Sequence, residues 1–135
     1  MQMRKLVFGL AVLIWVSQAR PAFALCAGRS AEEMLKQSDA AFVGKVIKLE
    51  YLDKDLSPLR YQIPRRVKLT FQISKAMKGA VKTPQEIYGW DDPTFAENPD
   101  WRGFLGETII VYANHSSDIL PGKQVLVTGQ CLIYR

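Results

Sequence analysis

The sequence predicts a mainly β domain with five strands and one short N-terminal helix, folded as a small barrel or sandwich. Residues 47–51 and 66–73 alternate apolar and polar side chains, which is typical of strands with one face in a core. Residues 108–113, TIIVYA, form a continuous apolar run suited to a central strand. Residues 31–37 follow a helix-capping motif instead, so we expect the helix there.

The expected helix runs from Ala31 to Gln37. Ser30 is followed three residues later by Glu33, a capping box in which each side chain satisfies a backbone N–H group of the other residue. Ala31 and Leu35 are four residues apart and share a face. Because two turns are too short to be stable alone in water, we expect this helix to pack on the sheet.

The strands are expected in sequence order, separated by turn-forming residues. The first begins near Ala41, and Gly79 closes the second. Pro64 lies in the connection between them, where it restricts strand pairing to an edge. The remaining strands are expected at 85–90, 108–113 and 124–129, the last of them after the turn signal Pro121-Gly122.

Residues 1–24 predict a secretory signal peptide. Arg4 and Lys5 precede the apolar run LVFGLAVLIWV, and small residues lie at positions 22 and 24. The run has 11 residues, against the roughly 20 of a membrane-spanning helix, and no later stretch is apolar enough to span. We therefore expect cleavage after Ala24, a secreted or periplasmic protein without a transmembrane span, and one domain at 25–135.

The charge of the chain does not favour a nucleic-acid partner. The full sequence has 18 basic and 13 acidic residues, but three of the basic residues and none of the acids lie in the signal peptide, so cleavage lowers the net charge from +5 to +2. Basic residues gather between 43 and 82, and acids between 86 and 118. We expect these halves to attract each other in the fold or to be solvated, with steering of a charged partner as the alternative.

An N-terminal cysteine is followed by SAEEMLKQSDAAFVGKVIKLE, RRVKLTFQISKAMKG, FLGETIIVYAN and VTGQCLIYR, which cover nearly the whole mature chain. Together these segments resemble bacterial members of the tissue inhibitor of metalloproteinases (TIMP) and netrin-like domain superfamily. The resemblance implies a five-stranded OB-like barrel with the N terminus held against it. It also implies a non-enzymatic protein-interaction module whose partner is an extracytoplasmic protein, in its sharper form a metalloprotease.

In the animal inhibitors of this superfamily, the mature chain begins with a cysteine whose amine and carbonyl chelate the zinc of the protease. The predicted cut leaves Leu25 ahead of Cys26, so chelation of this kind requires cleavage one residue later. The resemblance makes Leu25 and Cys26 candidates for partner contact.

Cys26 has three possible roles: lipid attachment, metal binding or a disulfide. Leu25 is too large to precede a lipidated cysteine, and one other cysteine with one histidine gives no zinc-type spacing. Cys131 lies at the other end of a chain expected to be exported, where disulfides persist. We expect a disulfide between Cys26 and Cys131 that joins the termini, and no metal or cofactor.

Residues 89–104, GWDDPTFAENPDWRGF, gather acids among aromatic side chains. Exposed tryptophan in a long loop often anchors a partner, and packing over the barrel end is the alternative. The acids also suit a hydrolase, although their spacing matches no calcium loop and does not separate catalytic from solvated carboxylates. We expect partner binding and no catalytic residues, with Trp90, Asp91, Asp92, Phe95 and Trp101 as the candidates.

Three further interpretations have less support. His115 precedes two serines and an aspartate, which we interpret as a polar turn and not as a catalytic triad. An OB-like barrel can bind nucleic acid or oligosaccharide on its second and third strands, but few aromatic residues are interleaved with Arg65, Arg66, Lys68 and Lys75. A structural component of the cell envelope is the remaining alternative.

Overall fold

The computed structural model describes residues 29–55, 63–94, 98–129 and 132–134. The signal peptide, Leu25, Cys26, Phe95 and Cys131 lie outside these ranges, so the predictions made for them, including the disulfide, are not addressed by the structure. Within the described residues, no helix is both long enough and apolar enough to cross a membrane.

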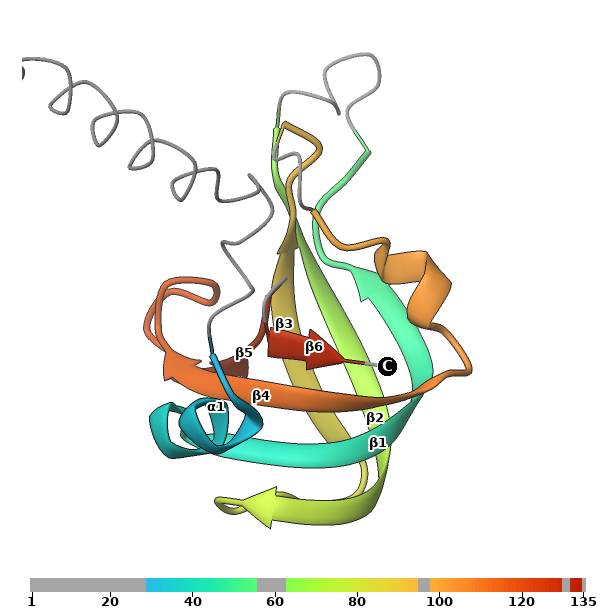
Figure 1. Cartoon of the computed structure of the whole chain (residues 1–135). Coiled ribbons are helices and arrows are strands. Elements are labelled where there is room, and N and C mark those ends of the chain that lie inside the picture. The colour runs from blue at the N-terminus through green and yellow to red at the C-terminus, as the bar shows by residue number, and fades with distance from the viewer. Residues whose placement is uncertain (1–28, 56–62, 95–97, 130–131, 135) are drawn as a thin grey trace, which may run out of the picture.

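The fold is a closed five-stranded β-barrel with one short helix (Figure 1). The strands follow the order β1-β2-β3-β5-β4, and β1 pairs with β4 to close the barrel. The β3–β5 pair is parallel and the other pairs are antiparallel. This confirms a mainly β, OB-like barrel and excludes the sandwich. The elements are α1 Ala31–Gln37, β1 Ala40–Tyr51, β2 Arg65–Lys78, β3 Gln85–Asp91, the 3-10 helix η2 Trp101–Phe104, β4 Thr108–Ser116, β5 Val125–Val127 and β6 Ile133–Tyr134.

The helix has the bounds that its capping motif predicts. The Ser30 hydroxyl accepts a hydrogen bond from the Glu33 backbone N–H at 3.1 Å. Figure 1 shows α1 on the outside of the barrel, where Met34 packs with Ala41 and Tyr112. At the other end of the helix, the ammonium of Lys78 donates to two carbonyl oxygens of the last turn, at 2.8 and 3.0 Å. The end of β2 therefore fixes the end of the helix.

The prediction that Ile47 shares a buried face with Leu49 and Tyr51 is wrong. The pairing of β1 with β2 shifts register between Val46 and Lys48, so Ile47 is the extra residue of a β-bulge. Its side chain is 49% exposed, whereas Leu49 and Tyr51 pack against the core. The bulge turns the side chain outward and bends β1 around the barrel.

The predicted polar turn is present from residue 117 on but is wrong for His115 and Ser116. Strand β4 continues to Ser116, and His115 pairs with Leu126 of β5. Polar residues suit this end of β4 because the His115 side chain is exposed, while its backbone N–H donates to Asp39 Oδ2 at 2.8 Å. The apolar run at 108–113 predicted a strand that ends before His115, because the residues after position 113 are polar.

Opposite charges of the two halves meet across the β2–β3 ladder. Arg65 Nη2 lies 3.6 Å from Asp91 Oδ2, and Lys68 Nζ lies 3.8 Å from Glu86 Oε1. The two segments therefore attract each other at these two places, whereas further ion pairs lie within the basic segment, between Lys48 and Glu50, Lys68 and Glu50, and Arg66 and Asp53. The Arg65 and Asp91 side chains are only 16% and 15% exposed, whereas the more exposed pair of Lys68 and Glu86 contributes little to stability.

Candidate functional site

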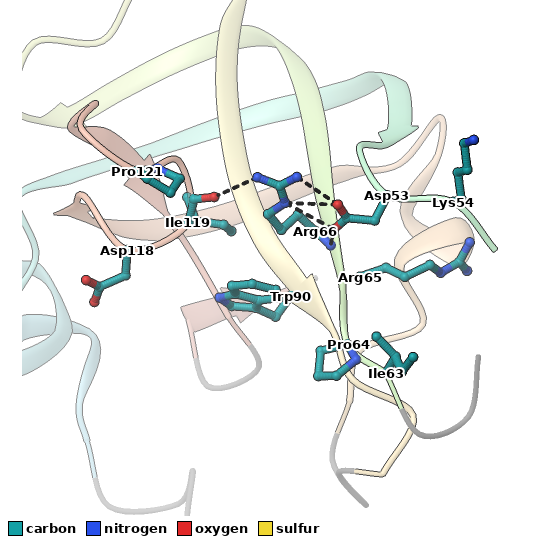
Figure 2. A pocket seen from close by; sticks show the side chains of 10 residues that line it. All are labelled: Asp53, Lys54, Ile63, Pro64, Arg65, Arg66, Trp90, Asp118, Ile119 and Pro121. Carbon is teal, nitrogen blue, oxygen red and sulfur yellow. Dashed lines mark hydrogen bonds and ion pairs between the residues drawn. The ribbon is translucent and has the colours of Figure 1, made fainter. Parts of the chain in front are cut away.

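A groove of about 560 Å³ lies over one end of the barrel, where three parts of the chain meet (Figure 2). One wall is formed by the described ends of the β1–β2 connection, residues 53–54 and 63–64. The floor is formed by β2 and β3, and the other wall by residues 118, 119 and 121 between β4 and β5. In OB folds, this combination of elements binds oligonucleotides and oligosaccharides. The lining residues are Asp53, Lys54, Ile63, Pro64, Arg65, Arg66, Trp90, Asp118, Ile119 and Pro121.

Trp90 is the aromatic residue of the groove. Along β3 the side chains alternate, so that Ile87 enters the core and Trp90 points outward. The Trp90 side chain is 43% exposed and lies across the β2–β3 ladder from Arg66. The structure thus places this predicted contact residue on the surface, inside a groove.

The backbone beneath Trp90 is fixed by Trp101. The Trp101 indole N–H donates to the Trp90 carbonyl oxygen at 3.1 Å. The Trp101 ring also occupies the space beside Gly89, since a Cβ at this glycine would lie 2.5 Å from the ring. Gly89 therefore lets a large ring pack directly against the strand that carries Trp90.

Arg66 joins the two walls to the floor. Its Nη2 donates to Asp53 Oδ1 at 2.7 Å, its Nε donates to Asp53 Oδ2 at 3.0 Å, and its Nη1 donates to the Ile119 carbonyl at 3.2 Å. The Arg66 backbone N–H also donates to Asp53 Oδ2 at 2.8 Å. These hydrogen bonds to Arg66 hold the pKa of Asp53 below its ordinary value. A bidentate pair with a third contact therefore holds the Arg66 side chain between the two walls.

Arg65 is held at the side of the groove by an aromatic ring and an acid. Its guanidinium carbon lies 4.0 Å from the centre of the Tyr51 ring, and its Nη2 lies 3.6 Å from Asp91 Oδ2. Asp91 also accepts a hydrogen bond from the Asn98 amide. The predicted contact residue Asp91 is therefore engaged within the fold.

Comparison with protein-family models, with curated proteins and with solved structures found no match for this chain. The resemblance to netrin-like domains therefore rests on the sequence segments quoted above.

Trp101 does not form part of a contact surface. The structure buries it to 2% exposure, with its ring edge-on to Phe104 at a centroid distance of 6.4 Å. For Trp101, the alternative of packing over the barrel end therefore fits better, since its ring belongs to the buried core cluster. Composition alone could not show which of the two tryptophans is buried, because burial depends on whether each side chain faces the core or the solvent.

The described acids of 89–104 have separate local roles. Asp92 accepts hydrogen bonds from the Thr94 backbone N–H at 3.0 Å and hydroxyl at 2.6 Å, and so closes a turn. Asp100 accepts from the Gly103 N–H at 3.3 Å and caps η2. Within the described ranges, no three acids, histidines or cysteines come together in a way that could hold a metal ion.

Several groove residues were missed by the sequence reasoning. Asp53 and Ile119 are separated from Arg66 by 13 and 53 positions, and no local pattern indicates that they meet. Gly89 did carry a signal, since an isolated glycine within a strand often marks the close approach of another group.

Proposed function

We propose that this protein is an exported, non-catalytic binding module of the TIMP and netrin-like type, and that its groove holds part of an extracytoplasmic protein. The exposure of Trp90 is the observation that carries the proposal. Burial of apolar surface stabilises a fold, so a half-exposed indole contributes less free energy to folding than a buried one. Tryptophan is also enriched among the residues that dominate the binding energy of protein interfaces.

The chemistry of the groove supports an apolar anchor from the partner. Ile63, Pro64 and Pro121 are exposed beside the indole, and Arg66 is held among them. Apolar walls around a few fixed polar groups are typical of binding sites. Because Asp53 already holds the guanidinium in place, a partner does not have to order it on binding.

The predicted signal peptide supports a partner outside the cytoplasm. Inhibition of a metalloprotease is the more specific form of the proposal. It requires Cys26 to be the first residue of the mature chain, so that its amine is free. Intact mass spectrometry of the exported protein measures this directly. A mature chain that begins at Leu25 would contradict zinc chelation by the terminus while leaving the groove as a binding site.

Photocrosslinking in the native host tests the groove. A photoreactive amino acid replaces Trp90 in one variant and Leu105 in a matched control, since Leu105 is also apolar and is 55% exposed. We expect a discrete crosslinked protein from position 90 and none from position 105. Equal products from both positions, or none from position 90, would contradict the proposal.

The two alternative functions predict other results. A hydrolase would lose a measured turnover when the four acids of the 89–104 segment are replaced by alanine, namely Asp91, Asp92, Glu97 and Asp100. A structural component of the envelope would remain in the wall or membrane fraction without a discrete protein partner.

A further inference from the structure

A second hollow, of about 490 Å³, lies farther along β3. Its floor includes Tyr88, which lies two residues before Trp90 on the same face of the strand. It is lined by residues 82–86 before and within the start of β3, by Tyr88, by His115 of β4 and by residues 123–126.

The second hollow carries an excess of positive charge. Lys82 and Lys123 line it, and their ammonium groups make no ion pair with any residue of the described ranges. Glu86 is the one acid among the lining residues. Its carboxylate is already engaged, by Lys68 at 3.8 Å and by the Tyr88 hydroxyl, which donates at 3.3 Å. The two lysines are therefore left without a counter-charge.

The two hollows are neighbours on one surface. The connection between β4 and β5 contributes residues 118, 119 and 121 to the groove around Trp90, and then Lys123 and Gln124 to the second hollow. On β3, Trp90 lies two to four residues from Tyr88 and Glu86. At about 3.3 Å per residue this is roughly 7–13 Å, which an extended peptide spans with two to four residues.

We propose that the partner segment is an extended acidic peptide. Its apolar side chain enters the groove around Trp90, and its carboxylates, two to four residues away, enter the second hollow, which Lys82 and Lys123 line. This inference rests on the proposed function and adds the chemistry of the partner. Charge complementarity supports it, because the uncompensated lysines attract acidic groups and disfavour basic ones.

Selection from a phage library of random linear peptides on the mature protein tests this inference. We expect enriched peptides to contain an apolar or aromatic residue with Asp or Glu two to four positions away. The variant with Lys82→Glu and Lys123→Glu should bind these peptides at least about tenfold more weakly. Its control carries Lys36→Glu and Lys45→Glu, which change the net charge equally at exposed lysines outside both hollows.

The outcomes separate this inference from the proposed function. Peptides that depend on Trp90 but contain no acids, or that bind both charge variants equally, would overturn the acidic partner and leave the groove as a binding site. Peptides that ignore a Trp90→Ala substitution would contradict both. A library that shows no enrichment over the bare coat protein would overturn the linear acidic peptide, whereas photocrosslinking from position 90 decides the proposed function independently.

Discussion

The indole nitrogen of Trp101 donates a hydrogen bond to the carbonyl oxygen of Trp90 at 3.1 Å, so one tryptophan supports the strand that displays the other. Trp101 packs from inside the barrel, next to Gly89, and Trp90 points outward into the groove. Two similar residues in one segment therefore have different roles, one in stability and one in surface recognition.

Alanine substitutions should separate the two tryptophans. Trp101→Ala removes a fully buried ring and should lower the free energy of unfolding by about 3–5 kcal/mol. Trp90→Ala should lower it by about 1 kcal/mol or less, because the side chain is half-exposed. Urea denaturation followed by circular dichroism measures both changes. Binding of the selected peptides should fail for Trp90→Ala although this protein remains folded. Equal losses of stability would contradict the assignment of roles.

Gly89→Ala should destabilise the barrel. The added Cβ would lie 2.5 Å from the Trp101 ring and 3.2 Å from the Thr128 carbonyl oxygen, so the ring would have to move. Overpacking of this kind costs about 1–3 kcal/mol, measurable as a shift of the urea midpoint. Gly129→Ala is the matched control, since a Cβ there meets nothing within 4 Å. Similar midpoints for both variants would show that the ring relaxes without cost.

Elements with strong local signals could be predicted from the sequence. The Ser30 cap marked the start of α1, and the alternating pattern of 66–73 identified the core residues of β2. Elements defined by tertiary contacts could not. Strand β6 has two residues and exists through pairing with Ile110 and Val111. The bulge at Ile47 depends on register with a partner strand, which periodicity does not encode.

The candidate site was predicted only in part. Trp90 was identified because tryptophan is enriched at binding surfaces, but its groove is built by contacts between distant segments. The bond from Arg66 to the carbonyl of Ile119 joins residues 53 positions apart. Sequence reasoning placed Arg66 among basic residues of one strand and could not show that its charge is already paired with Asp53.

The pair of Asp53 and Arg66 should make stability depend on pH. Hydrogen bonds from Arg66 lower the pKa of Asp53 in the folded state, so the pair stabilises the fold above the pKa of the unfolded chain. This stabilisation is lost as the pH falls through the lower, folded-state pKa. We therefore expect the wild-type protein to have a higher free energy of unfolding than the Asp53→Asn variant at neutral pH. This difference should be smaller than the loss caused by Gly89→Ala, and it should vanish in acid.

Urea midpoints of both proteins over a series of pH values measure this difference. Asp118→Asn is a suitable control, because the Asp118 carboxylate makes no ion pair within the described residues although it lines the same groove. A difference between wild type and Asp53→Asn that stays constant as the pH falls would mean that the pair acts through packing and not through charge.

The predicted disulfide can be tested independently of the groove. Arg29 and Tyr134 line the same pocket, of about 190 Å³, beside α1. In the sequence, Cys26 precedes Arg29 by three residues and Cys131 precedes Tyr134 by three, and both cysteines lie outside the described residues. Their pairing therefore stays a prediction from the sequence.

Reduction of the exported protein should raise its intact mass by two hydrogens. A closed loop of roughly 100 residues contributes on the order of 4 kcal/mol in the chain-entropy model, so reduction should lower the urea midpoint strongly. A variant with serine at both Cys26 and Cys131 should resemble the reduced protein and no longer respond to reductant. An unchanged mass after reduction, or a midpoint that the double substitution leaves in place, would show that the termini are not joined.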